Sequence, residues 1–283
     1  MYLEGAAQKK GTIHCNDTFV IRTSNATKLK VLELYVSQNI KAVAPICNAC
    51  PELEVLKIDA LPLESLNLPK LETLVVKDYQ CHCLAPGQCC KWITQFPKLH
   101  CLQLLDDPSV AFSFYEKSFR PTLECLLHSS SIEELAFNTY WITPAIAIPN
   151  VTSLKIDVLG IDENANDDDC DYEDTWTSSN CIKFLRPHCK RIEKLFINWD
   201  CNRNLDNFML FIAENCTNLE LFSYSAIDMN VEFWKLFCQK RKESGNVQKK
   251  LQILTHFNLS SDLLLEANAT TFGSSVKWSK HVF

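Results

Sequence analysis

A short pattern of aliphatic positions recurs along the chain. An aliphatic residue is followed by two variable residues, a second aliphatic residue, one variable residue and a third apolar residue. The last two apolar positions alternate with variable ones, which is the period of a strand with one buried face. The pattern therefore predicts short strands at nine places: Leu29-Leu32-Leu34, Leu53-Leu56-Ile58, Leu71-Leu74-Val76, Leu99-Leu102-Leu104, Ile132-Leu135-Phe137, Val151-Leu154-Ile156, Ile192-Leu195-Ile197, Leu219-Phe222-Tyr224 and, in a weaker form, Leu251-Leu254.

The spacing of these nine phrases predicts the fold. They start at intervals of 24, 18, 28, 33, 19, 41, 27 and 32 residues, with a mean close to 28. This spacing is typical of leucine-rich repeats that carry insertions. One repeat cannot bury its own apolar face, so neighbouring repeats stack around a shared core. We predict an α/β leucine-rich-repeat solenoid, with a curved parallel sheet on the concave face and irregular helices and extended segments on the convex face.

The segments between the phrases predict the remaining elements. Residues 181–189, 206–215 and 231–242 have apolar residues three and four apart, which indicates helices. Residues 61–69 and 139–149 are too short and too rich in proline for full helices, so extended or single-turn segments are expected. The prolines just before several phrases are predicted to end the preceding helix and turn the chain into the next strand; they are Pro51, Pro69, Pro97 and Pro149.

These patterns divide the chain into three parts. Residues 1–28 are predicted to form an N-terminal cap or a partial repeat. Residues 29–257 form the solenoid of about nine irregular repeats, with an acidic insertion at 157–180. Residues 258–283 form a C-terminal cap or tail.

Composition restricts the class of protein. The 283 residues are 47% hydrophobic and 22% charged, as in ordinary soluble proteins, and the net charge of −6 argues against a nucleic-acid partner. No apolar run is long enough for a membrane span, and residues 1–20 lack the pattern of a secretion signal. Only six glycines are present, and none is spaced to form the common phosphate-binding loops.

Cysteine usage leaves two compartments open. The 15 cysteines are odd in number and scattered, which favours reduced thiols in the cytoplasm. The alternative is an extracellular or surface protein with disulfides and glycans. Six glycosylation sequons support that alternative; they begin at Asn16, Asn25, Asn150, Asn215, Asn258 and Asn268.

Two segments carry a family resemblance. Residues 50–58 read CPELEVLKI and residues 216–224 read CTNLELFSY, each behind a helical segment. Over residues 29–257 the chain resembles the cysteine-containing repeats of F-box leucine-rich-repeat proteins. The resemblance implies the substrate-recognition part of a ubiquitin ligase receptor, which binds a cullin-RING adaptor through its F-box. Residues 1–28 are too short and too polar for an F-box, so we expect either that this domain lies upstream of Met1 or that the protein works without it.

Two further clusters carry possible chemistry. The run CHCLAPGQCC contains a weak zinc candidate, but its spacing is unlike that of known zinc sites, so a loop with incidental thiols is the favoured interpretation and no metal is predicted. The candidate thiols are Cys81, Cys83, Cys89 and Cys90. Cys47 and Cys50 are interpreted as packing residues.

The acidic insertion holds nine Asp or Glu residues between positions 157 and 174 and no Lys or Arg, so it carries −9 and the remainder about +3. It is interpreted as a solvated loop or as a clamp for a basic partner segment; calcium is disfavoured because the EF-hand glycine and glutamate are missing. Its central residues are Asp167, Asp168, Asp169, Asp171, Glu173 and Asp174.

The chain contains none of the common catalytic motifs, and its seven histidines lack motif partners. We therefore predict no enzyme and no cofactor, but a protein-binding module without membrane or nucleic-acid partners. Strand alternation assigns the variable residues to the concave face. The predicted contact residues are Tyr35, Lys57, Val75, Gln103, Leu105, Lys155, Phe196 and Leu221. The surface around Phe196, beside the acidic insertion, is the predicted primary site.

Overall fold

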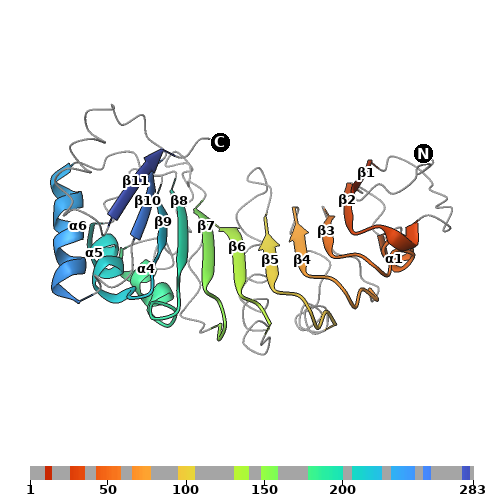
Figure 1. Ribbon diagram of the computed structural model, residues 1–283, viewed down its shortest axis with the longest axis horizontal. Coiled ribbons are helices and arrows are strands. Elements are labelled where there is room, and N and C mark those ends of the chain that lie inside the picture. The colour runs from red at the N-terminus through yellow and green to blue at the C-terminus, as the bar shows by residue number, and fades with distance from the viewer. Residues whose placement is uncertain are drawn as a thin grey trace, which may run out of the picture. The chain divides into compact units, whose positions relative to one another are not determined.

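The computed structural model consists of two compact units. They comprise residues 1–137 with 148–150, and residues 138–147 with 151–283. Each unit is described separately below (Figure 1). The structure describes residues 10–14, 26–35, 43–58, 66–77, 95–105, 131–139, 148–158, 178–199, 206–224, 231–245, 251–255 and 276–280.

The described part of the first unit is a parallel sheet in which each strand pairs with the next along the chain. Its strands are β1 (Lys10–His14), β2 (Val31–Tyr35), β3 (Val55–Ile58), β4 (Thr73–Val76), β5 (Cys101–Leu104) and β6 (Glu134–Thr139). A single 3-10 turn, η1 (Ala26–Lys28), precedes β2, and a short helix, α1 (Val43–Asn48), precedes β3.

The second unit repeats this arrangement with longer helices. Its parallel strands are β7 (Ser153–Val158), β8 (Lys194–Trp199), β9 (Leu221–Tyr224), β10 (Leu251–Thr255) and β11 (Val276–Lys280). Between them come α4 (Ser178–Leu185), α5 (Asp206–Asn215) and α6 (Val231–Glu243). The three helices lie together on one side of the strands, α4 against α5 and α5 against α6 (Figure 1).

This arrangement confirms the predicted α/β fold class. Each of the nine predicted phrases overlaps a parallel strand, which in the eight full phrases holds the last two apolar positions. The three predicted helices correspond to α4, α5 and α6, with the bounds of α5 as predicted. Two further strands, β1 and β11, lie in the segments expected to cap the solenoid. Most of 61–69 and 139–149 lies outside the described residues.

One predicted phrase is wrong in register. The pattern pairs Leu251 with Leu254, but Ile253 is the residue opposite Phe222 in the sheet. Leu251 and Ile253 are fully buried, whereas Leu254 is partly exposed. A slip of one residue moves a side chain to the other face of a strand, so Leu254 belongs to the exposed face.

The core of each unit is a column of apolar side chains in register across neighbouring strands. Each member is at most 2% exposed, and burying a side chain of this size contributes about 1.5–3 kcal/mol. The columns are Leu32, Leu56, Leu74, Leu102 and Leu135 in the first unit, and Leu154, Leu195, Phe222 and Ile253 in the second.

A backbone ladder fixes the step between repeats. The carbonyl of Lys30 accepts hydrogen bonds from two consecutive amides of the next repeat, Glu54 N at 2.8 Å and Val55 N at 2.9 Å. The equivalent carbonyls of five further repeats accept the same pair; they belong to Glu54, Glu72, His100, Thr152 and Glu193. Because one oxygen receives both amides, a repeat cannot slide along its neighbour without breaking both bonds.

Tight turns deliver the chain into the strands. The amide of Leu53 donates to the carbonyl of Cys50 at 3.1 Å, which places Pro51 at the second position of the turn. Proline is favoured there because its φ angle is already fixed near the required value. The prediction that these prolines end a helix is therefore wrong in detail for Pro51: α1 ends at Asn48, and the proline shapes the turn that follows.

Helix α6 is held against the preceding repeat by a buried cation. The Arg241 side chain is 4% exposed, and its Nη1 and Nη2 donate to the carbonyls of Cys216 at 3.2 Å and Leu219 at 2.8 Å. Burial lowers the pKa of Arg241 from its usual value, and the neighbouring Cys216 and Cys238 oppose that shift. The fork of the guanidinium thus satisfies the two carbonyls of the turn that leads into β9.

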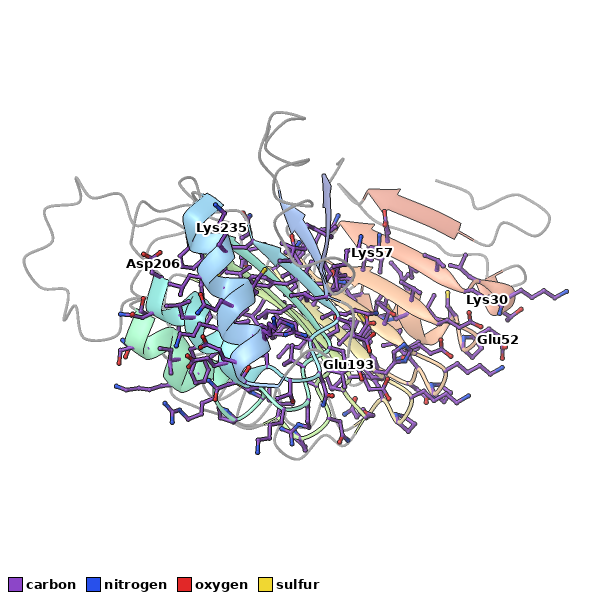
Figure 2. The ribbon with its side chains drawn as sticks, turned by 60° about the vertical axis from the view of Figure 1, so that its left-hand side comes forward. Lys30, Glu52, Lys57, Glu193, Asp206 and Lys235 are labelled. Carbon is purple, nitrogen blue, oxygen red and sulfur yellow. The ribbon has the colours of Figure 1, made fainter. Side chains whose placement is uncertain are left out.

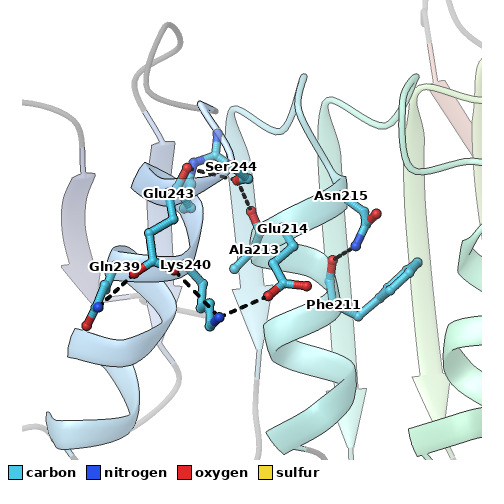
Figure 3. Close-up of polar contacts among 9 residues, drawn as sticks. Phe211, Ala213, Glu214, Asn215, Gln239, Lys240, Glu243 and Ser244 are labelled. Atoms are coloured by element: carbon cyan, nitrogen blue, oxygen red, sulfur yellow. Dashed lines mark hydrogen bonds and ion pairs between the residues drawn. The ribbon is translucent and has the colours of Figure 1, made fainter.

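Polar contacts join α5 and α6 at their surface (Figure 3). Lys240 Nζ lies 3.5 Å from Glu214 Oε1 of α5 and 3.5 Å from Glu243 of its own helix. Ser244 Oγ lies 3.5 Å from the carbonyl of Ala213. Exposed ion pairs of this kind contribute little, so the apolar side chains and Arg241 carry most of the attachment of α6.

The described cysteines are buried and unbridged, which confirms that Cys47 and Cys50 are packing residues. The thiol of Cys50 donates to the carbonyl of Ile46 at 3.5 Å, and the thiol of Cys189 donates to the carbonyl of Leu185 at 3.3 Å, so each thiol bonds to the carbonyl four residues before it. Burial raises the pKa of Cys47 to about 12 and that of Cys238 to about 11.

Replacing Arg241 by methionine should destabilise the second unit. The variant keeps a long side chain but removes both guanidinium donors, so the Cys216 carbonyl keeps only the bond from the Leu219 amide and the Leu219 carbonyl loses its bond to Arg241. We expect the free energy of unfolding to fall by about 1–3 kcal/mol in urea titrations. The matched control is Lys242→Met at the exposed neighbouring position, where a change below about 0.5 kcal/mol is expected. Equal losses in the two variants would contradict the role given to Arg241.

The Cys47 thiol should make stability depend on alkaline pH. Its pKa rises from 9.0 in the unfolded chain to about 12 in the folded one, so its contribution is fully present below pH 9 and is lost as pH rises toward 12. Wild type should therefore lose about 1.4 kcal/mol per pH unit relative to Cys47→Ala above pH 9. Urea titrations of both proteins from pH 7 to 10.5 test this; a constant difference across that range would contradict it.

Candidate binding faces

The variable residues of the strands form rows on the face opposite the buried columns. In the first unit, register aligns two rows across β2 to β6. The first row is Val31, Val55, Thr73, Cys101 and Glu134; the second row is Glu33, Lys57, Val75, Gln103 and Ala136. The predicted contact residues Lys57, Val75 and Gln103 therefore stand side by side, as alternation requires.

Lys57 and Glu33 on this first face neutralise each other. Lys57 Nζ lies 2.6 Å from Glu33 Oε1 on the neighbouring strand, and the two side chains are 35% and 12% exposed. Figure 2 shows Lys57 on the strands, with Lys30 and Glu52 at the edge where the strands begin. At that edge Lys30 pairs with Glu54 at 2.5 Å, which raises the pKa of Lys30, and Glu52 pairs with Lys70.

Val75 is less exposed than its place in the alternation predicts. Its side chain lies on the outer face but is only 5% exposed, and Cys101 and Ala136 are each 7% exposed. Val75 stands between Lys57 and Gln103, whose longer side chains flank it in the middle of the sheet. The expectation that Val75 is an apolar anchor is therefore corrected: it offers little area to a partner.

Of two other predicted contact residues in this unit, the structure describes the side chain of one and not that of the other. Leu105, directly after β5, is half-buried, and its amide donates to the carbonyl of Val76 at 2.7 Å. Tyr35 ends β2, but its side chain lies outside the described residues.

The face of the second unit is more apolar. Lys155, Phe196, Ser223 and Leu254 form one row across β7 to β10, and Ser153, Lys194, Leu221 and Gln252 form the row beside it. Phe196, Leu221 and Leu254 are half-buried, whereas Lys155 and Lys194 are exposed. Ser223 is 2% exposed because it is a small residue between the larger Phe196 and Leu254. The structure thus brings together Lys155, Phe196 and Leu221 as predicted. It adds Leu254, which the sequence pattern had placed on the buried face because its predicted register was wrong by one residue.

Positive charge gathers around β8. Residues 178–199 hold five basic residues and one acidic residue, a net charge of +4. Lys183, Arg186, Lys190 and Arg191 are exposed, on α4 and on the turn that leads into β8. Arg186 lies over the ring of Phe211, 5.5 Å from its centroid. These basic residues are visible in the sequence, but the charge of the acidic insertion that precedes them outweighs theirs in the net charge of the chain.

Several predicted residues lie outside the described part of the chain. They include the zinc candidates Cys81, Cys83, Cys89 and Cys90 and the whole acidic cluster from Asp167 to Asp174, so the clamp for a basic segment stays a prediction. Among the residues that the structure describes, no group of three or more His, Cys, Asp or Glu is placed to hold a metal ion. None of the described helices is both long and apolar enough to cross a membrane.

Comparison with known proteins supports the fold. No protein-family model matches the sequence, and no curated protein matches it. Among solved structures, the chain is similar to the leucine-rich repeat-containing protein LegL7 from Legionella pneumophila, with a TM-score of 0.53 and 12% sequence identity. The match covers 87% of this chain and 82% of that one. Together with the parallel repeat strands, this similarity establishes a leucine-rich-repeat solenoid fold for this chain.

Proposed function

We propose that this chain is a non-catalytic module that binds another protein through the exposed faces of its repeat strands. The observation that supports this most directly is the composition of those faces. Variable residues stand in fixed rows over a rigid core, and they combine half-exposed apolar side chains with charges of both signs. A rigid surface of this kind binds without paying a large ordering cost.

A protein fits these faces better than nucleic acid. Phosphate recognition requires several cations spaced along a surface. On the first unit the Lys57 charge is neutralised by Glu33, and on the second unit Lys155 and Lys194 lie on two sides of the apolar Phe196 rather than along a continuous row of cations. Apolar residues such as Phe196 and Leu221 occupy the central positions instead, and aromatic anchors of this type dominate protein interfaces.

The finer proposal is that this module recognises substrates for an F-box-type ubiquitin ligase receptor in the cytoplasm. It is supported by the resemblance of the cysteine-containing phrases and by the burial of Cys50 and Cys216 at equivalent positions in their repeats. The described thiols are unbridged, as suits a reducing compartment. Co-purification of the native protein with a cullin adaptor tests this proposal, and its absence would leave the binding module without the ligase role.

The second candidate is an extracellular binding protein, and one observation favours it. The sequon at Asn150 lies in an exposed turn, where a glycosyltransferase could reach it. The sequon at Asn215 is less suited, because its Nδ2 donates to the carbonyl of Phe211 at 2.9 Å. Intact mass of the native protein before and after glycosidase treatment, with a count of free thiols, separates the two compartments.

Site-specific photo-crosslinking in cells should locate the binding surface. A benzophenone amino acid at position 196 or 57 should yield a discrete protein adduct, because these positions lie on the strand faces. The matched control is position 239, an exposed site on α6, where no equivalent adduct is expected. Adducts of equal yield from positions 196, 57 and 239, or adducts with nucleic acid alone, would contradict a protein-binding strand face.

A further inference from the structure

We propose that the second unit binds an acidic peptide segment that presents one bulky apolar side chain. The surface that receives it, called here the Phe196 patch, consists of Lys155, Lys194, Phe196, Leu221 and Leu254. This inference rests on the proposed function, because it specifies the chemistry of a protein partner at one of the two faces.

The apolar part of the patch spans three neighbouring strands. Phe196 on β8 faces Ser223 on β9, and Leu254 on β10 lies on the far side of that serine. Leu221 stands beside Lys194 one row away. Neighbouring strands are about 4.8 Å apart, so these three half-exposed side chains border one area about two strand spacings wide. That area suits a single leucine or aromatic side chain rather than a long apolar helix face.

The cations of the patch lie on two sides of Phe196. Lys155 is directly opposite Phe196 on β7, and Lys194 is two residues earlier on β8. Lys194 is exposed, and within the described residues no carboxylate lies within ion-pair distance of it. Lys155 has its side chain 52% exposed and makes only a long contact with Asp157, at 3.4 Å. An apolar residue on the patch would therefore be flanked by sites for carboxylates.

The surroundings of the patch add further positive charge. Lys190 and Arg191 are exposed on the turn that enters β8, while the acidic residues near the start of β8 and β9 are Glu193 and Glu220. Among the described residues around the patch, four cations therefore stand against these two acids and Asp157. Cations beside an apolar contact contribute to selectivity more than to affinity. On the first unit the corresponding lysine, Lys57, is already paired with Glu33, so the same partner is not favoured there.

Peptide binding by the intact chain tests this proposal. The probe is a fluorescent peptide of about 12 residues with a central leucine and Asp or Glu within two residues on each side. Its controls replace the leucine by alanine, or replace every acid by lysine. Fluorescence anisotropy should show binding at least 10-fold tighter for the acidic leucine peptide than for either control, weakened several-fold by raising salt from about 50 to 300 mM.

Substitutions test whether the peptide binds at the Phe196 patch. Lys194→Glu and Phe196→Ala should each weaken it at least 10-fold, whereas Lys57→Glu on the first unit and Lys240→Glu on α6 should change it less than twofold. Because Phe196 is half-buried, circular dichroism and urea titration monitor the folding of Phe196→Ala. If that variant unfolds, Lys194→Glu, at an exposed position, carries the test alone.

The outcomes separate this proposal from the broader one. Preference for the basic peptide, binding unaffected by Lys194→Glu, or equal binding of a single-stranded oligonucleotide would overturn the acidic-peptide proposal. Absence of peptide binding, combined with a protein adduct from position 196 in the crosslinking experiment, would overturn it while leaving the protein-binding module intact.

Discussion

The doubled hydrogen bond between successive repeats is the constraint on which the rest of this structure depends. A single carbonyl before each strand receives two amides of the next repeat, as Lys30 receives Glu54 and Val55. This contact sets both the distance and the register between strands. Only in that register do Leu32, Leu56 and their counterparts meet as one buried column. The variable residues then line up by necessity, because the side-chain period of a strand is two. The hydrogen bonds between successive repeats thus align the variable residues into rows, whatever those residues are.

The last described helix of the second unit is held by more than apolar packing. In that unit α6 packs against α5, and Arg241 supplies two donors to the turn at Cys216 and Leu219. A buried guanidinium is costly to desolvate, and its stabilising effect comes from the charge-assisted hydrogen bonds that it donates to these two carbonyls. After α6, Gly245 adopts a φ of 75°, in the left-handed region that glycine tolerates, and ends the helix. The chain can then turn toward β10.

Sequence periodicity predicted the elements whose apolar residues are cleanly spaced. Residues 206–215 form α5 as predicted, and eight of the phrases hold their register. The ninth failed because Leu251, Ile253 and Leu254 are all aliphatic, so the local pattern fits two registers equally well and only pairing with Phe222 decides between them. β1 and β11 were missed because KGTIH and VKWSK lack the aliphatic triad. The exposed fraction of an outward-facing residue could not be predicted either. Val75 is only 5% exposed because longer side chains flank it on the neighbouring strands, and its own phrase does not show which residues those are.

The two faces show why overall charge is a poor guide to what such a protein binds. The net charge of −6 is an average over an insertion of −9 and a remainder of about +3. Within that remainder, the charge available to a partner depends on pairing rather than on number. Lys57 is held 2.6 Å from Glu33 and would have to break that contact to meet a new anion, whereas Lys194 has no such cost among the described residues. The strands of the two units therefore present one face on which the lysine is paired with a glutamate, and one face on which Lys194, beside Phe196, has no such pair among the described residues. Selectivity in this fold resides in those few variable positions, and the repeated core holds them in place.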